Sequence, residues 1–407
     1  MVPPTPRPIV VVGVGADGWD GLSNASRTAV EQADVVFGSA RQIASVREHC
    51  TEARTWPTPL LPNLRSMFDA CVGADVCVLA SGDPMFHGIG VTLAREFGAE
   101  RLRVHPAPSS VSLACARLGW ALHHTTTVSL VNNPIETLLP DLADGRRVIV
   151  LSRGSSTPGE VARMLSDNGF GDSTMTVLEQ LGGPDERVTV GLARESDFGD
   201  TDALNVIALE CVRDAHAPRL TRVPGLADSA YTGDGQMTKQ EVRALTLGAL
   251  APAPGELLWD IGGGSGTIAI EWMRTDGSCR AVTFESSQAR REQIETNALR
   301  LGVPGLIVRG GAPESFAAVA DAAPDAVFIG GGLTGTDMLE ACWKAVRTGG
   351  RVVANSVTAE SDSLLVAAAA KYGGDLRRFQ IYRSESLGAF TTWRPQLPVT
   401  QWSAVKR

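Results

Sequence analysis

The fold is decided by a short apolar run that ends in glycines, LLWDIGGGSG at Leu257–Gly266. A second stretch of the same kind, IVVVGVGADG, occupies Ile9–Gly18. A strand that ends in glycines lets a ligand approach the backbone closely, and the helix that follows directs its first amide groups toward that ligand. The chain is therefore expected to hold two nucleotide-like pockets, one after each of these strands.

Strands and helices alternate regularly after the turn at Leu257–Gly266. The candidate strands are Leu257–Asp260, Ala281–Glu285, Leu306–Arg309, Ala326–Ile329 and Arg351–Asn355. Two later runs, Arg378–Tyr382 and Gln401–Val405, fit an antiparallel pair that closes the sheet. The pattern predicts a doubly wound α/β domain over residues 236–407.

The half of the chain before this domain also alternates between strands and helices. Its candidate strands are Ile9–Val12, Val35–Phe37, Val76–Ala80, Leu102–His105, Val128–Leu130, Val148–Leu151, Thr176–Leu178 and Asn205–Leu209. Helical stretches such as Ser109–Leu118 lie between several of them, so mixed α/β layers are expected over residues 8–212. Residues 213–235 contain several prolines and glycines and few apolar pairs, which predicts an interdomain linker.

Length and composition fit a globular protein of two or three domains, with 407 residues, 43% apolar residues and 20% charged residues. The net charge of -8 and the absence of a basic stripe argue against a nucleic-acid partner. The seven cysteines form no C-x-x-C pair and no cluster with histidines, so no metal site is expected. Neither a signal peptide nor a membrane span is recognisable, and we expect a cytoplasmic protein.

Two acids decide which ligand the glycine turn at residues 262–266 is expected to bind. Asp260 ends the first strand, where a carboxylate that faces the pocket can meet an ammonium group, and Glu285 ends the second strand, where it can accept both hydroxyls of a ribose. A ligand with an amino-acid head and a ribose matches S-adenosylmethionine. A pattern read from Gly264 to Ala269 also gives G-x-G-x-x-A, so the glycines alone leave NAD open.

This half of the chain resembles the class I methyltransferases, and among them the subfamily that acts on cobalamin precursors. The resemblance rests on these stretches: MTKQEVR at 237–243, DIGGGSG at 260–266, Phe284-Glu285, GGAPE at 310–314, Asp325 with GGG at 330–332, and GGRVVAN at 349–355. It implies that the methyl-donor pocket is lined by Thr238, Asp260, Gly262, Gly263, Gly264, Ser265, Gly266, Glu285 and Ala312. The family usually has an acid or amide where Gly311 stands, so adenine would rely on backbone groups there.

The candidates for substrate binding and catalysis in this half rest on weaker signals. Thr238 followed by Glu241 fits a helix N-cap with its capping-box partner, which alone would explain the threonine. Lys239 and Arg243 fall four residues apart on one helical face, where they could bind substrate carboxylates or simply face solvent. Two further candidates, Glu314 and Asn355, follow strand ends and are expected to face the cleft.

The turn near the beginning of the sequence satisfies G-x-G-x-x-G at Gly13–Gly18. The next strand, Val35–Phe37, is followed by Gly38 and Ser39 and supplies no acid for a ribose. A G-x-G-x-x-G pattern without that acid is a weak indication of a dinucleotide site. More information comes from two later loops, ASGDPMFHG at 80–88 and HPAPSSV at 105–111.

These loops resemble the tetrapyrrole (corrin/porphyrin) methylase family, with further agreement in LEQLGGPDE at 178–186 and LNV at 204–206. In that family the methyl donor binds between two α/β subdomains, and the resemblance covers residues 8–212. The matching positions are Ala16, Ser81, Gly82, Asp83, Phe86, Ser109 and Ser110. Gly82–Pro84 taken alone is also compatible with a plain turn. His87 is a candidate substrate-facing donor, and its lack of metal-binding neighbours argues against a metal there.

The combination of the two domains implies an enzyme of cobalamin biosynthesis that uses one S-adenosylmethionine in each domain and no metal. The resemblance implies methylation of C-5 and C-15 of precorrin-6B, with loss of the ring-C acetate carboxyl, to give precorrin-8X. Because both families tend to self-associate, it also implies a homo-oligomer. Two alternatives remain open, an NAD(P)-dependent oxidoreductase and a tetrapyrrole-binding scaffold with one inactive domain.

Overall fold

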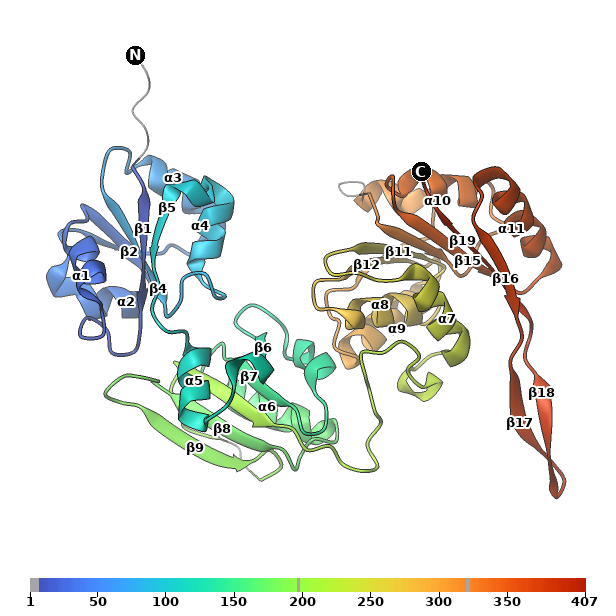
Figure 1. The fold of residues 1–407 in the computed structure, drawn as a ribbon, viewed down its shortest axis with the longest axis horizontal. Coiled ribbons are helices and arrows are strands. Elements are labelled where there is room, and N and C mark those ends of the chain that lie inside the picture. Colours follow the sequence, from blue (N-terminus) through green and yellow to red (C-terminus); the bar gives the residue numbers. More distant parts are fainter. Residues whose placement is uncertain (1–6, 196–197, 320–322) are drawn as a thin grey trace, which may run out of the picture. The chain divides into compact units, whose positions relative to one another are not determined.

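The computed structural model describes residues 7–195, 198–319 and 323–407. They form two compact units, drawn in Figure 1. The first unit comprises Met1–Ile135 and Asp144–Ala217, and the second comprises Glu136–Ala143 and Pro218–Arg407. Within the described residues, no helix combines the length and the apolar character needed to cross a membrane.

The first unit begins with a five-stranded parallel sheet in the order β3-β2-β4-β1-β5. Its elements are β1 (Ile9–Val14), α1 (Asn24–Glu31), β2 (Val35–Gly38), α2 (Ala40–Val46), β3 (Ala53–Thr55), α3 (Leu64–Asp69), β4 (Val76–Ser81), α4 (Ile89–Phe97) and β5 (Leu102–His105). Val12 packs with α1 and α2 on one face, whereas Val11 packs with α3 and α4 on the other. A sheet covered on both faces explains the continuous apolar runs of its strands.

A second five-stranded sheet, in the order β6-β7-β10-β8-β9, completes the first unit. The elements are α5 (Ser110–Leu118), β6 (Thr126–Ser129), β7 (Arg147–Leu151), α6 (Thr157–Asp167), β8 (Thr174–Glu179), β9 (Arg187–Leu192) and β10 (Asn205–Glu210). Val111 and Ala114 of α5 pack on Ile149 and Leu178 of this sheet. All pairings except β6 with β7 are antiparallel.

The second unit is built on a seven-stranded sheet in the order β13-β12-β11-β14-β15-β19-β16. Its elements are α7 (Gln240–Leu250), β11 (Leu257–Ile261), α8 (Thr267–Thr275), β12 (Arg280–Phe284), α9 (Gln288–Arg300), β13 (Ile307–Arg309), β14 (Ala326–Ile329), α10 (Met338–Ala345), β15 (Arg351–Ser356), α11 (Ala359–Tyr372), β16 (Asp375–Phe379) and β19 (Val399–Val405). Helices α7, α8 and α9 cover one face, and α10 and α11 the other. The doubly wound fold expected here is confirmed.

Strand order reverses at β11, because β12 lies on one side of it and β14 on the other. Ligands of open α/β sheets bind beyond the carboxyl ends of the strands at such a switch point. The glycine turn after Ile261 lies at this position. Short 3-10 helices connect other elements, namely η1 (Arg47–His49), η2 (Leu61–Asn63), η3 (Ala99–Arg101), η4 (Leu122–His124), η5 (Ile135–Asp141), η6 (Asp228–Ala230) and η7 (Glu314–Val319).

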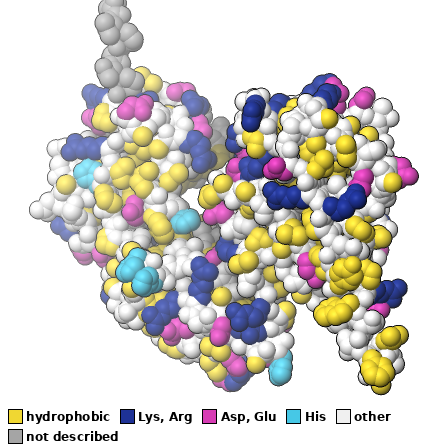
Figure 2. Space-filling view, turned by 45° about the vertical axis from the view of Figure 1, so that its right-hand side comes forward, with side chains coloured by type: hydrophobic (Ala, Val, Ile, Leu, Met, Phe, Trp, Pro, Cys, Tyr) yellow, Lys and Arg dark blue, Asp and Glu magenta, His cyan; other side chains and the backbone are white. Residues whose placement is uncertain are grey.

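A β-hairpin that the sequence did not reveal projects from the second unit (Figure 1). It consists of β17 (Tyr382–Leu387) and β18 (Phe390–Pro395), which interrupt the chain between the closing strands β16 and β19. Several of its large apolar side chains are exposed, and Figure 2 shows them gathered on the projecting arm. An antiparallel pair does close the sheet, but its first strand is Asp375–Phe379, so the predicted segment Arg378–Tyr382 was placed three residues too late.

The beginning of α7 differs from the expected capping box. Helix α7 begins at Gln240, and Lys239 rather than Thr238 stands at the N-cap, where its side chain makes no capping hydrogen bond. The carbonyl of Thr238 instead accepts a hydrogen bond of 2.5 Å from Nη1 of Arg243. Arg243 therefore fixes the residue before the N-cap, but it does not replace a capping side chain, because a guanidinium only donates hydrogen bonds and a cap must accept them from backbone amides.

Residues 218–235, which lie in the predicted linker, belong to the second unit. Leu226 and Tyr231 are buried in the same apolar cluster as Leu247 of α7 and Trp272 of α8. The hydroxyl of Tyr231 donates a hydrogen bond of 2.9 Å to Glu271. This part of the segment is packed against the second unit's core, although its proline and glycine content resembles that of a linker.

Candidate functional site

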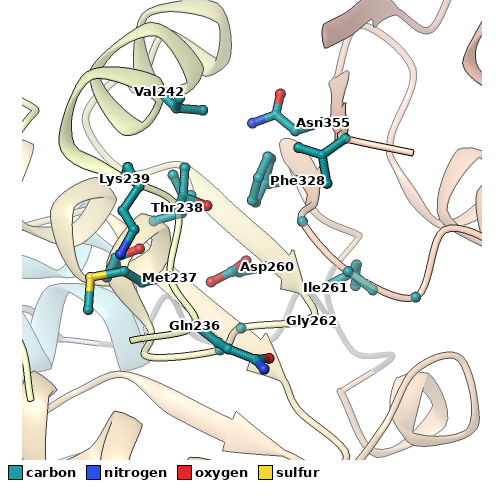
Figure 3. A pocket seen from close by; sticks show the side chains of 18 of the residues that line it. Gln236, Met237, Thr238, Lys239, Val242, Asp260, Ile261, Gly262, Phe328 and Asn355 are labelled. Atoms are coloured by element: carbon teal, nitrogen blue, oxygen red, sulfur yellow. The ribbon is translucent and has the colours of Figure 1, made fainter. Parts of the chain in front are cut away.

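A pocket of about 620 Å³ lies at the carboxyl edge of the parallel strands in the second unit (Figure 3). Its wall contains the ends of β11, β12, β14 and β15, the beginning of α7 and the base of the β17–β18 hairpin. Of the predicted donor-binding residues, the pocket is lined by Thr238, Asp260, Gly262, Gly263, Gly264, Glu285 and Ala312. Residues from many separate elements therefore meet at the switch point of the sheet.

The glycine turn is shaped so that no side chain fits at its centre. Gly262 has a φ of +74°, and a Cβ there would lie 2.7 Å from the backbone of Gly331. Gly264 has a φ of +57°, and a Cβ there would lie 2.7 Å from the carbonyl oxygen of Gln236. Both positions therefore need glycine for conformation and for space. The turn leaves its backbone accessible to a ligand in the pocket.

Asp260 lies near the middle of the view in Figure 3, and its side chain is 1% exposed. Burial raises the pKa of its carboxyl to about 7, while the backbone amide of Ala269 and the hydroxyl of Thr283 partly oppose that rise. Within the described residues, this carboxylate forms no ion pair. A buried carboxylate that lacks a cation is suited to bind an ammonium group from a ligand.

Glu285 follows β12 and is fixed by two backbone amides. Its Oε2 accepts a hydrogen bond of 3.0 Å from Gly264, and its Oε1 accepts one of 2.9 Å from Ser287. The side chain is 5% exposed and lines the pocket. An oriented carboxylate at this place in a doubly wound fold is suited to accept hydrogen bonds from ribose hydroxyls.

Two of the predicted donor-binding residues do not face the pocket of the second unit as the structure describes it. Ser265 is buried, with its hydroxyl 3.5 Å from the carbonyl oxygen of Gln236. Gly266 is the N-cap residue of α8 and has a φ of +77°. Both residues therefore belong to the turn but do not line the described pocket. Gly311 does line the pocket.

Arg243 cannot bind substrate carboxylates, and that interpretation is corrected. Its side chain is 0% exposed, because it lies under Tyr231 and forms an ion pair of 2.5 Å with the buried Glu271. It also donates to the carbonyl oxygen of Leu226. The four-residue spacing with Lys239 was therefore misleading, because Arg243 points into the core and Lys239 toward the pocket.

The remaining catalytic candidates of the second unit lie in different surroundings. Asn355 lines the pocket, where its Nδ2 donates to Thr246 at 2.8 Å and its Oδ1 accepts from Gln401 at 3.0 Å. Lys239 also lines the pocket, and its Nζ donates to the carbonyl oxygen of Gly235 at 3.2 Å. Glu314 begins η7 on the exposed surface and is not a lining residue of the described pocket.

Three charged residues of this pocket were missed from the sequence, namely Glu241, Arg290 and Arg383. Glu241 was considered only as a capping partner. Arg290 donates to Asp234 and to Gln236 at the rim of the glycine turn. Arg383 reaches the pocket from the hairpin, and no motif around it indicated this position.

In the first unit, the ends of β1 and β4 are packed closely together. Gly82 donates its backbone amide to the carbonyl oxygen of Val14 at 3.0 Å. A Cβ on Gly13 would collide with the carbonyl oxygen of Gly82 and would lie 2.7 Å from the backbone nitrogen of Ala107. Position 13 therefore needs glycine, because the loops that contain Gly82 and Ala107 approach its backbone too closely for a side chain.

The polar residues of these loops have partners that hold the loops in shape. Oδ1 of Asp83 accepts a hydrogen bond of 2.8 Å from the amide of Met85, which stabilises the turn. The hydroxyl of Ser81 lies 3.0 Å from a guanidinium nitrogen of Arg41. Ser109 is the N-cap of α5, where its hydroxyl accepts from the amide of Ser112 at 3.1 Å. Ser110 is the first residue of that helix.

Ala16, in the first glycine turn, lies beside the loop that follows β8. A Cβ added to Gly183 would lie 2.9 Å from the Cβ of Ala16. The two subdomains of the first unit therefore meet next to the turn.

Phe86 is 38% exposed, and its ring contacts that of His87 at 4.9 Å between centroids. Among the described residues, no group of three potential metal ligands occurs.

Each unit matches a family of methyltransferases. Residues 8–197 match the family of tetrapyrrole (corrin/porphyrin) methylases, and residues 229–406 match the precorrin methyltransferase domain. Precorrin-6Y C(5,15)-methyltransferase (decarboxylating) from Mycobacterium tuberculosis is 48% identical over 404 residues, which are 98% of this chain and 100% of that protein. The chain belongs to the precorrin-6Y C(5,15)-methyltransferase family.

Two shorter relatives match only part of the chain. A cobalt-precorrin-7 C(5)-methyltransferase from Salmonella typhimurium is 31% identical over 180 residues, covering 44% of this chain and 88% of that protein. A probable cobalt-precorrin-6B C(15)-methyltransferase (decarboxylating) from Saccharolobus solfataricus is 30% identical over 157 residues, covering 37% of this chain and 78% of that protein. In other organisms, separate proteins are thus named for the two methylations.

Proposed function

We propose that the chain is a bifunctional C-methyltransferase of cobalamin biosynthesis. It methylates C-5 and C-15 of precorrin-6B and removes the ring-C acetate carboxyl as carbon dioxide, which gives precorrin-8X. The observation that carries this proposal is the near full-length identity of 48% to an enzyme named for both methylations and for decarboxylation. The pocket with Asp260, Glu285 and the glycine turn supports methyl-donor binding in the second unit.

We assign the C-5 methylation to the first unit and the C-15 methylation with decarboxylation to the second. The assignment rests on the resemblance of each unit to its family, and the existence of separate relatives named for each methylation is consistent with it. Each unit then binds its own S-adenosylmethionine. The donor supplies a methyl group on a sulfonium, which is a good leaving group.

In the second unit, Asp260 would bind the donor's ammonium group and Glu285 its ribose hydroxyls. Gly262–Gly264, Thr238 and Ala312 would form the surrounding wall. In the first unit, the donor would contact Ala16, Phe86 and the residues of the two loops, namely Ser81, Gly82, Asp83, Ser109 and Ser110. In the first unit, the side chains of Asp83 and Ser109 accept hydrogen bonds from backbone amides of their own loops. Backbone groups of these loops would therefore provide much of the donor binding.

Neither methylation demands strong acid–base catalysis, because the enamine-like ring carbons are themselves nucleophilic. The protein contributes alignment of the reacting carbon and exclusion of water. In the decarboxylation, the bond between the acetate methylene and its carboxyl breaks, and the electron pair passes into the conjugated ring. Carbon dioxide leaves, and a proton converts the methylene to a methyl group.

The two alternative functions receive less support. An NAD(P)-dependent oxidoreductase would use a fold of the same class, but the family contains methyltransferases and the turn at Gly13 has no ribose acid after β2. A scaffold whose second unit is inactive would not need the buried and unpaired carboxylate of Asp260, and the relative at 48% identity is named for both methylations. Methyl transfer from both units is therefore the function that we favour.

The test is incubation of the intact chain with precorrin-6B and isotopically labelled S-adenosylmethionine. We expect two methyl groups per ring and release of carbon dioxide. Glu285→Ala should abolish methylation at C-15, and Asp83→Ala should impair methylation at C-5. Transfer of a hydride from a nicotinamide, without any methyl transfer, would establish the oxidoreductase alternative instead.

We also propose that the chain forms a homo-oligomer. The exposed apolar side chains on the hairpin support this, with Leu387 63%, Phe390 78% and Trp393 69% exposed. Light scattering during size-exclusion chromatography should give a mass above that of one chain. Replacement of Phe390 and Trp393 by serine should lower that mass, whereas an unaltered chain that is monomeric would contradict the proposal.

A further inference from the structure

Charged side chains of both signs line the pocket of the second unit. The buried acids Asp260 and Glu285 lie at the ends of β11 and β12, next to the glycine turn. The cations Lys239 and Arg383 lie on the part of the wall formed by the beginning of α7 and by the hairpin, together with Glu241, whereas Arg290 stands at the rim of the glycine turn and pairs with Asp234. A cationic donor matches the buried acids, and Lys239 and Arg383 are placed to meet a different, anionic ligand.

Arg383 is the best placed of the cations, because the fold fixes its position. It lies on β17 at the base of the hairpin, where Ile381 and Gln396 are joined by a backbone hydrogen bond of 2.7 Å. Its Nη2 donates to Glu241 at 2.6 Å and lies 3.6 Å from Asp228. Its side chain is nevertheless 38% exposed, so part of the guanidinium remains accessible.

The guanidinium retains donors that the protein does not use. Among the described residues, only Nη2 of Arg383 has a hydrogen-bond acceptor, which leaves the two N–H donors of Nη1 unused; Nε also has no acceptor, but it is buried. A guanidinium has five N–H donors and can bind one carboxylate while it donates to another. Glu241 is therefore suited to hold the side chain in place, and the arginine hydrogen bond keeps the pKa of Glu241 below its ordinary value.

We infer that Arg383, assisted by Lys239, binds a carboxylate side chain of the ring substrate and so makes the hairpin base a determinant of substrate specificity. The inference rests on the proposed function, because it takes a polycarboxylate ring as the substrate. The apolar neighbours Phe379, Ile381 and Leu397 line the same part of the pocket and are suited to contact the ring itself. Arg383 acts in substrate binding and positioning, apart from methyl-donor binding.

The experiment compares Arg383→Met with Arg394→Met in the intact chain. Arg394 stands opposite Arg383 in the hairpin register, is 67% exposed, pairs with Glu385 and does not line the described pocket. The ligands are a stable corrin polycarboxylate, its fully methyl-esterified counterpart and S-adenosylhomocysteine. Binding of each is measured by calorimetry, and kcat and KM for the C-15 methylation are measured separately.

Loss of a charge-assisted hydrogen bond should weaken binding of the polycarboxylate to Arg383→Met by about tenfold or more. KM should rise by a similar factor, while S-adenosylhomocysteine binding and the affinity for the ester stay unchanged. Arg394→Met should match the unaltered chain in every measurement. Arg383→Lys keeps the charge and should lie between the two, and it replaces Arg383→Met if that variant does not fold.

Equal affinity of the unaltered chain and Arg383→Met for the polycarboxylate would overturn the inference. An equal loss for the acid and the ester would also overturn it, because it would show a general effect on the pocket. Failure of the proposed function is a separate result, since the unaltered chain would then transfer no methyl group to the ring.

Discussion

Asp260 links the proposed methyl-donor site of the second unit to pH. Burial raises the pKa of its carboxyl from 3.8 to about 7, so the folded chain binds this proton more tightly than the unfolded chain does. The stability that the protonated Asp260 carboxyl contributes is fully present below its unfolded-state pKa of 3.8. It is lost as the pH rises through the folded-state pKa of about 7. Above about pH 7 the full cost of the buried charge is present.

Asp260→Asn should therefore stabilise the protein at high pH and not at low pH. Urea unfolding should show a larger free energy of unfolding than for the unaltered chain at about pH 8, and little difference at about pH 4. The same variant should bind S-adenosylhomocysteine about tenfold more weakly at high pH, because it cannot pair with the ammonium group. A variant that is no more stable at high pH would contradict this account of Asp260.

Arg243 is predicted to matter for stability and not for substrate recognition. Arg243→Met leaves Glu271 buried without its cation, which should lower the free energy of unfolding by about 3–5 kcal/mol. Chemical denaturation measures this loss. At a temperature where the variant is still folded, KM for the ring should be unchanged, and a raised KM there would restore Arg243 as a candidate ligand for substrate.

The sequence predicted some of these residues better than others. Asp260 and Glu285 stand at the ends of adjacent strands, so local spacing is enough to bring them together. Arg383 and Glu241 are 142 positions apart, and only the return of the hairpin brings them into contact. Helical spacing likewise placed Lys239 and Arg243 on one face, but it could not reveal that Glu271 draws Arg243 into the core.

At the scale of elements, the central strands were predictable because burial on both faces makes them continuous apolar runs. Four strands, β3, β9, β17 and β18, escaped, because they are largely exposed and lack that pattern. The start of α7 was also misplaced, because Lys239 and not Thr238 stands at the N-cap, where its side chain makes no capping hydrogen bond. The hairpin forms part of the pocket wall, so its omission also concealed part of the site.

The two glycine turns should respond alike to alanine, although they lie in unrelated sheets. Gly262→Ala meets the backbone of Gly331, and Gly13→Ala meets that of Gly82. Each should destabilise its unit by roughly 1–3 kcal/mol and abolish donor binding in that unit only. Thermal unfolding and S-adenosylhomocysteine titration measure the two effects.

The matched control is Gly248→Ala in α7, where an added Cβ has no heavy atom within 4 Å. Alanine in a helix interior should stabilise the chain by roughly 0.5–1 kcal/mol and leave donor binding intact. If Gly262→Ala binds the donor as well as Gly248→Ala does, the glycine turn is not part of the donor site.

At the scale of the whole molecule, the chain consists of two units with different sheet topologies. The parallel sheet of the first unit and the seven-stranded sheet of the second both place a glycine turn after a central strand, β1 in one and β11 in the other. The sequence indicated both turns, and the surrounding residues distinguish them. The carboxylates of Asp260 and Glu285 lie next to the second turn. The first turn is packed closely against the loops that contain Gly82 and Ala107.

The central claim is that these unrelated folds bind the same methyl donor, one molecule in each unit. Calorimetric titration of the intact chain with S-adenosylhomocysteine tests it most directly. We predict two molecules bound per chain, falling to one in Glu285→Ala and to one in Asp83→Ala, with the remaining site unchanged in affinity. A single molecule bound by the unaltered chain, lost completely in one variant and unaffected in the other, would contradict the claim.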